Sequence, residues 1–206
     1  MLRPATAPPL AAQGRAAYGR GMTALRRPRL TRDDWLLAGF EALCEVGPAA
    51  LGAEPLARRL GATKGSFYWH FADVPAYSAA LLALWEEDAA QGLEAASQAA
   101  TEAARLRGCA QAMAATAEAD SLTRRAESAI RAWAGTDPIA AEAVARVDTA
   151  RLARLHRLLS ACDIGNLEMA RIVYAAAIGM QAMRDPARDQ AAPAIGSLVD
   201  LILALR

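Results

Sequence analysis

The chain has 206 residues, of which 54% are hydrophobic, 5% are aromatic and 22% are charged, and its formal net charge is +1. This length allows one extended or two small domains, and a composition rich in alanine and leucine but poor in aromatic residues favours helices over strands. The three cysteines show no paired spacing, and neither they nor the two histidines belong to a metal-binding or nucleophile motif. We therefore expect an all-α protein without a cofactor, a disulfide framework or a catalytic site.

Residues 1–28 mix prolines and glycines with alanines and arginines, and they lack the long hydrophobic region of a signal peptide. We expect them to form a disordered basic tail. The basic excess of the chain lies in its first part, because residues 1–80 hold 10 basic and 6 acidic residues. An arginine-rich, solvated tail accounts for much of that excess.

The first helix is predicted to start after Thr31, because Asp34 three residues later completes a capping-box pattern in which Asp replaces the usual Glu or Gln. The helix should end near Gly47-Pro48. Its apolar positions include Leu36, Leu37, Phe40, Leu43 and Cys44.

A second, shorter helix is predicted to end at Gly61. Leu56, Ala57 and Leu60 form its apolar stripe, and Pro55 suits an early helical position. The three-residue link 61–63 then has the length of a helix-turn-helix connection.

Residues 63–71 read Thr-Lys-Gly-Ser-Phe-Tyr-Trp-His-Phe and predict a short helix with two different faces. Phe67 and Phe71 are four residues apart, so they share a face and can be buried together. Trp69 lies on the opposite face with Gly65 and Ser66, and it can meet a partner there.

The outward face of this helix has the chemistry of a DNA-recognition helix. Thr63 can cap the helix by accepting a backbone N–H bond. Lys64 and Tyr68 flank the outward face and can contact phosphates, while Gly65 permits a close approach of the backbone. The capped N-terminus also presents partial positive charge to a phosphate or to a base acceptor.

These three helices, followed by a fourth that starts near Asp73, resemble the DNA-binding domain of the tetracycline-repressor (TetR) family of bacterial regulators. The resemblance implies a helix-turn-helix DNA-binding domain over residues 29–73 and a helical ligand-binding and dimerisation domain over residues 74–206. It implies about nine helices in all. Beyond residue 73 the chain resembles the family only in its layout.

The resemblance also implies which residues face a double-stranded DNA operator, with Tyr68 and His70 near phosphates and Phe67 and Phe71 in the core. The operator-facing positions are Thr63, Lys64, Gly65, Ser66, Tyr68, Trp69 and His70.

One position departs from the family pattern. The family usually has a Lys or Arg contacting phosphate at the start of the fourth helix, where this chain has Val74-Pro75. We expect Arg29 or Arg32, beside Thr31 at the start of the first helix, to compensate, and we add Arg29 and Thr31 to the expected DNA contacts. For residues 1–28, the alternative to a disordered tail without a function is a basic arm that follows the DNA backbone.

The remaining helices are predicted from their breakers. Thr136-Asp137-Pro138 is a typical helix start, and Ile164-Gly165-Asn166 separates the next pair. The uncharged apolar stretch from Ile172 to Met183 is shorter than the ~20 residues of a membrane helix. We therefore expect a soluble, cytoplasmic protein without a membrane partner. The predicted ranges are 74–97, 101–119, 121–134, 138–162, 166–184 and 191–205.

The last two helices carry apolar stripes that predict a homodimer. Four such helices from two subunits would form a bundle, and a two-fold dimer would read both half-sites of a palindromic operator. The alternative is that both stripes only close the core of the monomer. The expected interface residues are Leu167, Tyr174, Ile178, Gln181, Ile195, Leu198, Leu201, Ile202 and Leu205.

Helices between residues 74 and 184 have the volume for an effector site, and a small molecule of unknown identity is the expected effector. The candidate pocket residues are Trp85, Met113, Arg131, Trp133, Tyr174 and Met180. The alternative for each of them is plain core, which is the commoner role of such residues at helical spacing, and Arg131 faces either an anionic ligand or solvent. The resemblance to the TetR family thus implies a ligand-responsive repressor, and the alternative is a helical scaffold without specific DNA binding.

Overall fold

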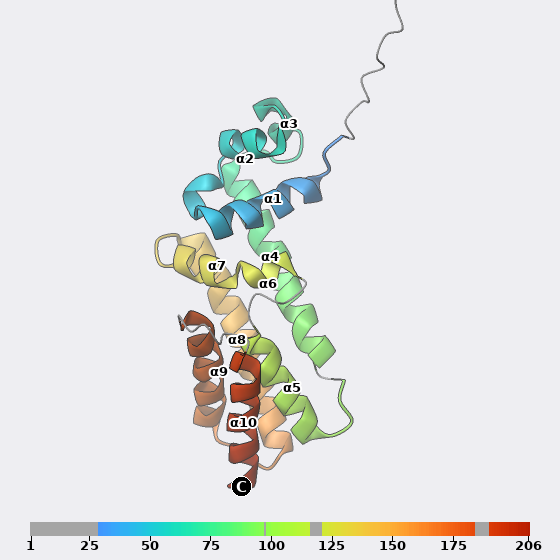
Figure 1. Ribbon diagram of the computed structural model, residues 1–206, viewed down its shortest axis with the longest axis vertical. Coiled ribbons are helices and arrows are strands. Elements are labelled where there is room, and N and C mark those ends of the chain that lie inside the picture. Colours follow the sequence, from blue (N-terminus) through green and yellow to red (C-terminus); the bar gives the residue numbers. More distant parts are fainter. Residues whose placement is uncertain (1–28, 97, 116–120, 184–189) are drawn as a thin grey trace, which may run out of the picture.

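The computed structural model describes residues 29–96, 98–115, 121–183 and 190–206, and all regular secondary structure in these ranges is helical. Figure 1 shows α1 to α3 at one end of an elongated molecule and α9 and α10 at the other, with α4 and α8 running between the two ends. The helices are α1 (Arg32–Glu45), α2 (Ala53–Leu60), α3 (Lys64–Tyr68), α4 (Val74–Ala96), α5 (Glu102–Ala114), α6 (Leu122–Arg125), α7 (Glu127–Ala134), α8 (Pro138–Ala161), α9 (Leu167–Ala182) and α10 (Ala191–Ala204), and a 3-10 turn, η1, spans Pro48–Ala50.

The all-α prediction is confirmed, with ten α-helices in the described ranges where the sequence suggested about nine. The predicted helix over 121–134 is two helices, because the backbone at Ala126 has a ψ of −8°, far from the α-helical value. Neither glycine nor proline marks this break. The predicted helix over 101–119 ends at Ala114, and its last residues, like the predicted tail, lie outside the described residues.

The predicted helix caps are confirmed. Thr31 Oγ1 accepts a hydrogen bond from the Asp34 backbone N–H at 3.2 Å, and the Asp34 carboxylate accepts one from the Thr31 N–H at 2.7 Å, which completes the capping box. Gly61 ends α2 with a φ of 61°, a left-handed conformation that glycine adopts without strain. The Asp137 side chain caps α8, with Pro138 at the first helical position.

An aromatic core fixes the end of the molecule that carries α1 to α3. Phe67 packs edge-on against Trp35 at a centroid distance of 5.5 Å, and Phe71 packs edge-on against Tyr77 at 4.8 Å. The Tyr77 hydroxyl donates to the Trp35 carbonyl at 2.9 Å, and a Cβ atom at Gly39 would lie 1.8 Å from this hydroxyl. Glycine is therefore required at residue 39, and Tyr77 joins α4 to α1 and α3.

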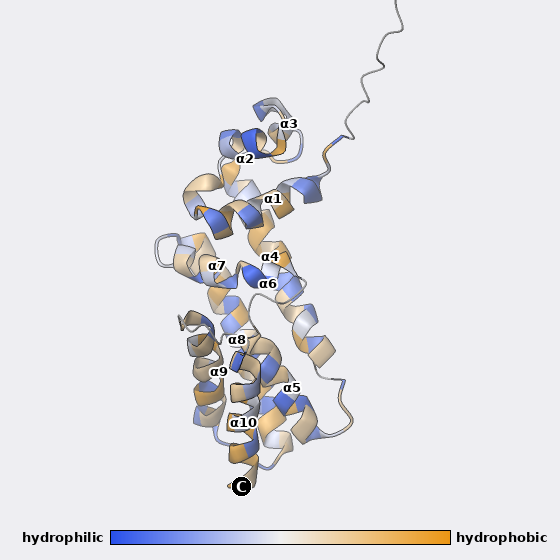
Figure 2. Ribbon diagram, viewed as in Figure 1, coloured by the Kyte–Doolittle hydropathy of each residue, from blue (hydrophilic) through white to orange (hydrophobic). Residues whose placement is uncertain are grey.

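A second hydrophobic core lies between α5, α8, α9 and α10. In Figure 2, α9 and α10 are coloured largely in the orange and tan of hydrophobic residues. No described helix is long and apolar enough to cross a bilayer. The fully buried side chains of this core include Leu106, Leu155, Leu159, Val173 and Val199.

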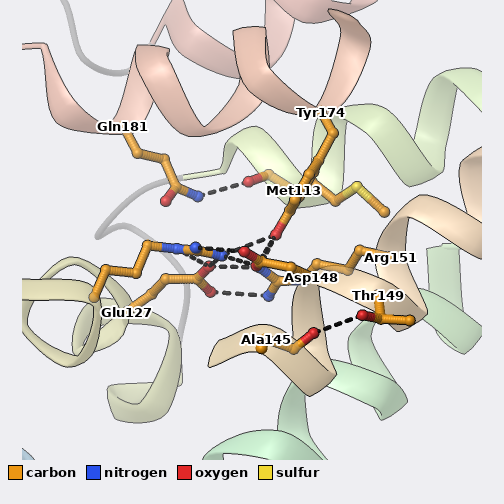
Figure 3. A network of polar contacts seen from close by, with 9 residues as sticks. Met113, Glu127, Ala145, Asp148, Thr149, Arg151, Tyr174 and Gln181 are labelled. Atoms are coloured by element: carbon orange, nitrogen blue, oxygen red, sulfur yellow. Dashed lines mark hydrogen bonds and ion pairs between the residues drawn. The ribbon is translucent and has the colours of Figure 1, made fainter. Parts of the chain in front are cut away.

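A buried ionic network connects α7, α8 and α9 (Figure 3). Glu127 of α7 is 4% exposed and accepts hydrogen bonds from both terminal nitrogens of Arg151 on α8. Arg131 donates to Glu127 at 2.9 Å and to Asp148 at 2.7 Å. The Tyr174 hydroxyl of α9 donates to Asp148 at 2.7 Å and accepts a bond from Arg131 at 2.8 Å.

This network keeps its charged form because every buried charge has an opposite partner. Burial alone would raise the pKa of Glu127, but the hydrogen bonds and charges of Arg151 and Arg131 hold that pKa below its usual value. Burial raises the pKa of Tyr174 to about 12, so the hydroxyl keeps its proton. Two carboxylates and two guanidinium groups therefore balance one another inside the protein.

We predict that Glu127→Gln lowers the free energy of unfolding by about 3 kcal/mol at pH 7, because the buried Arg151 loses its charged partner. The pKa of Glu127 is lowered on folding, so this contribution is present above the unfolded-state pKa and is lost as the pH falls through the folded-state value. Urea unfolding at pH 7 and at lower pH should show the difference between the parent and the variant shrinking with acid.

Glu86→Gln is the matched control, since Glu86 pairs with Arg146 at 2.7 Å in an ion pair whose arginine is mostly exposed. Its loss should be much smaller. Equal losses for the two variants, or a difference that grows with acid, would contradict the assigned role of Glu127.

Candidate nucleic-acid interface

Helix α3 presents the two faces that the sequence predicts. The side chains of Phe67 and Phe71 are 0% and 4% exposed, whereas Trp69 is 79% exposed and Tyr68 is 46% exposed. Thr63 Oγ1 accepts the Ser66 backbone N–H at 3.2 Å, so the predicted cap of α3 is confirmed. Burial of the two phenylalanines fixes the inner side of this segment, and Tyr68 and Trp69 therefore lie on the outer side.

An open recess lies against the outer side of α3. It encloses about 590 Å³ of empty space, open solvent included, and its lining residues are Arg29, Thr63, Gly65, Ser66, Trp69 and His70. A Cβ atom at Gly65 would meet only Thr63 Oγ1 at 3.8 Å, so packing within the protein does not require glycine there. The missing side chain leaves room for the atoms of a partner.

Two arginines at the start of α1 lie beside the aromatic residues that follow α3. The Arg29 guanidinium carbon is 5.9 Å from the centroid of the Trp69 ring, and that of Arg32 is 5.3 Å from the Phe71 ring. These distances permit cation–π attraction, which holds both charges near this face. Arg32 thus lies close to the segment that leads to Val74.

The cations at this end of the molecule fall into two groups. Arg58 pairs with Glu54 at 3.1 Å, and Arg59 pairs with the two glutamates of α1. Arg29, Arg32 and Lys64 make no ion pair with any described residue. The cations available to an anionic partner are therefore those beside α3.

Thr31 and His70, two of the predicted DNA contacts, already contact other residues of the protein. The Thr31 hydroxyl both donates to and accepts from Asp34 within the capping box, so its hydrogen bonds are already used inside the protein. His70 is half-buried, and its ring lies 6.5 Å from that of Trp35.

The structure does not bring the six candidate pocket residues together at one cavity. Trp85 and Trp133 are buried in the hydrophobic core near α1, and Met180 packs against the core of α5 and α8 to α10. Arg131 and Tyr174 belong to the ionic network, so Arg131 faces the carboxylates of Glu127 and Asp148.

Met113 is the one candidate that lines a recess between α4, α5, α6 and α8. Polar residues that the sequence reasoning missed lie beside it: Asp88, Arg124 and Arg151. The three-residue spacing of Asp148 and Arg151 within apolar sequence is a signal for paired charges on one helix face. Nothing in the sequence indicates that this face is buried.

The candidate dimer residues are divided between the surface and the core. Leu167, Leu201 and Leu205 are exposed, and Ile178 and Leu198 are half-buried. Tyr174, Ile195 and Ile202 are buried within the protomer, and the Gln181 side chain donates to the Met113 carbonyl at 2.6 Å. Ile172, which the prediction omitted, is 53% exposed on α9.

Comparison with known proteins agrees with the helix-turn-helix geometry. Residues 36–73 match the model of the family described as bacterial regulatory proteins, tetR family, and no curated protein matches the chain. A putative TetR-family transcriptional regulator from Rhodococcus sp. has a similar structure, with a TM-score of 0.71 and 17% identity over 84% of this chain and 98% of that one. A transcriptional regulator from Rhodococcus sp. Rha1 gives a TM-score of 0.68 at 18% identity, over 85% of this chain and 95% of that one.

The two structures show the fold, and the matched segment covers α1 from Leu36 onward, all of α2 and α3, and the residues that lead to α4. The helix-turn-helix segment, residues 36–73, thus matches the TetR family of bacterial regulatory proteins, and the chain shares the fold of the two solved regulators.

Proposed function

We propose that the protein is a ligand-responsive repressor that binds a palindromic DNA operator as a homodimer and is released by a small-molecule effector. The observation that carries this proposal is the outer side of α3, where Trp69 is 79% exposed beside cations that make no ion pair with the described residues. An exposed indole of this kind is typical of a binding surface. Because the proposed operator is chromosomal DNA, we also propose that the protein is cytoplasmic.

The proposed interface combines base contacts with phosphate contacts. Trp69 and Ser66 lie where a helix in the major groove meets base edges, and Gly65 lets the backbone approach them. Lys64, Tyr68 and the arginines of α1 would hold the phosphates. The proposed DNA contacts are Arg29, Thr31, Arg32, Thr63, Lys64, Gly65, Ser66, Tyr68, Trp69 and His70.

We predict that Trp69→Ala lowers specific operator affinity at least about tenfold without unfolding the protein, because the indole contacts DNA and not the core. Mobility-shift titrations with DNA from beside the gene measure the affinity, and circular dichroism checks the fold.

Ile139→Ala is the matched control, since Ile139 is an exposed apolar residue on α8. It should leave operator affinity unchanged. Absence of sequence-specific binding by the parent protein would favour the helical scaffold instead.

At the position of Val74 the TetR family usually has a cation that contacts phosphate, and Arg29 and Arg32 are the proposed substitutes. We expect the double variant Arg29→Ala, Arg32→Ala to flatten the dependence of operator affinity on salt concentration, by about 0.9 in the log–log slope for each phosphate contact removed. Arg146→Ala removes an arginine from the surface of α8 and should not change the slope. An unchanged slope in the double variant would exclude Arg29 and Arg32 from the interface.

The proposed dimer joins α9 and α10 of two protomers. These helices lie side by side at the end of the molecule opposite α3 (Figure 1). The exposed apolar residues of these helices are Leu167 and Ile172 of α9, Leu201 of α10, and Leu205 directly after α10, at 45%, 53%, 57% and 77%. A two-fold axis there would present two copies of α3 to half-sites about 34–36 Å apart.

We therefore predict that the double variant Leu201→Asp, Leu205→Asp is monomeric and loses operator affinity, because it places charges in an apolar interface. Analytical ultracentrifugation compares it with the parent and with an Ile139→Asp control, which should remain dimeric. A monomeric parent, or a double variant that stays dimeric, would contradict this interface.

Effector release requires that the ligand prefer a dimer whose α3 helices no longer fit the half-sites. Coupling of ~1–3 kcal/mol would lower operator affinity by about 5- to 150-fold. Helix α4 could carry a change at the ligand site to α3. Tyr77 near the start of α4 packs against Phe67 of α3, and Asp88 and Ala89 further along α4 line the same recess as Met113.

A further inference from the structure

The outer side of α3 carries few of the side chains that usually distinguish one base from another. Arginine reads guanine with two hydrogen bonds, and asparagine or glutamine reads adenine in the same way. Residues 63–71 contain none of these three residue types. The Thr63 hydroxyl already accepts the Ser66 backbone N–H, and a serine or threonine hydroxyl can bond to more than one base. Hydrogen bonds from α3 therefore explain little of a base preference.

The largest exposed group on this side is apolar. Trp69 is 79% exposed, whereas the other three tryptophans of the chain, Trp35, Trp85 and Trp133, are 0%, 1% and 6% exposed. The indole leaves a large apolar area in water, and a partner removes that area favourably where it offers an apolar group. On the major-groove edges of the base pairs, that group is the C5-methyl of thymine.

The protein holds the indole in a defined direction. Trp69 keeps α-helical backbone angles directly after α3, with a φ of −71° and a ψ of −25°. Phe67 and Phe71, two residues before and after it, are buried, so the indole points away from the core. The Arg29 guanidinium carbon lies 5.9 Å from the ring centroid, and cation–π attraction restricts the ring further. Trp69 therefore meets a partner as an oriented apolar surface.

Space for a methyl group lies beside the indole. Gly65 precedes Trp69 by four residues, so both lie on one side of this segment, and both line the open recess. A Cβ atom at Gly65 would meet only Thr63 Oγ1, at 3.8 Å. The edge of a base pair can enter this space until its methyl group touches the indole.

We infer that Trp69 selects thymine, through apolar contact with the C5-methyl group of one thymine in each half-site of the operator. Cytosine is disfavoured at this position, because it lacks the methyl group and presents an amino donor on the same edge. The base preference rests on the proposed function, since it requires α3 to lie in the major groove.

The test compares two versions of one DNA fragment from beside the gene, prepared with thymine or with uracil throughout. Uracil pairs with adenine as thymine does, but it has no C5-methyl group. Mobility-shift titrations of the full chain, in excess random-sequence competitor DNA, measure the specific affinity for each version. We expect the parent to bind the thymine fragment about tenfold more tightly, because one methyl group is buried in each of two half-sites.

Three variants locate the methyl contact. Trp69→Ala should bind both fragments with the same reduced affinity, and Trp69→Phe should still prefer thymine because it keeps an aromatic surface. Lys64→Ala is the matched control, since it loses a phosphate contact and should weaken both complexes by the same factor. An effect of uracil on DNA shape alone would persist in Trp69→Ala. All titrations use one low salt concentration, at which the reduced affinities remain measurable.

The indole itself gives a second measurement. Among the four tryptophans Trp69 alone is exposed, so acrylamide quenches its emission before that of the three buried rings. Saturation with the thymine fragment should shield Trp69 and lower the quenching constant. Trp69→Phe should lack this change.

Equal affinity of the parent for the two fragments would overturn the inference and leave the proposed repressor intact. A thymine preference that survives in Trp69→Ala, or an indole that acrylamide still quenches in the saturated complex, would overturn it as well. A parent protein that does not bind the thymine fragment above the random-sequence competitor would refute the proposed function itself, and the base preference with it.

Discussion

The hydrogen bond from the Tyr77 hydroxyl to the Trp35 carbonyl, with the aromatic rings around it, sets the position of α1 and α3 relative to α4. A helix of five residues is not stable alone, so α3 exists because Phe67 is buried against α1 and α4. The outward direction of Trp69 follows from the same burial. Any change that loosens Tyr77 therefore acts on recognition and on stability together.

Local signals in the sequence predict much of this end of the molecule. The capping box at Thr31, the left-handed Gly61 and the two faces of α3 depend on neighbouring residues, and the structure confirms them. The break at Ala126 does not follow from the sequence, because no glycine or proline marks it. The partners of Arg131 come from helices far away in the chain, and periodicity cannot name them.

The distribution of ion pairs explains how a chain with a net charge of +1 can favour an anionic partner at one end. Arginines on α2 are neutralised by glutamates of α1 and α2, whereas the cations beside α3 make no ion pair with the described part of the chain. The same distinction applies to the recess that Met113 lines, where Arg151 is neutralised by Glu127 but its Nε has no hydrogen-bond partner among the described residues. What matters for recognition is which donors remain unused, and the net charge does not report that.

Near neutral pH the ionic network of α7, α8 and α9 keeps a single protonation state at its buried groups. Glu127 has a lowered pKa, Tyr174 has a pKa raised to about 12, and the pKa values of both network arginines are raised by their acidic partners despite burial. None of these four groups gains or loses a proton near neutrality. The bonds that join these three helices therefore persist through small drifts in proton concentration around neutrality.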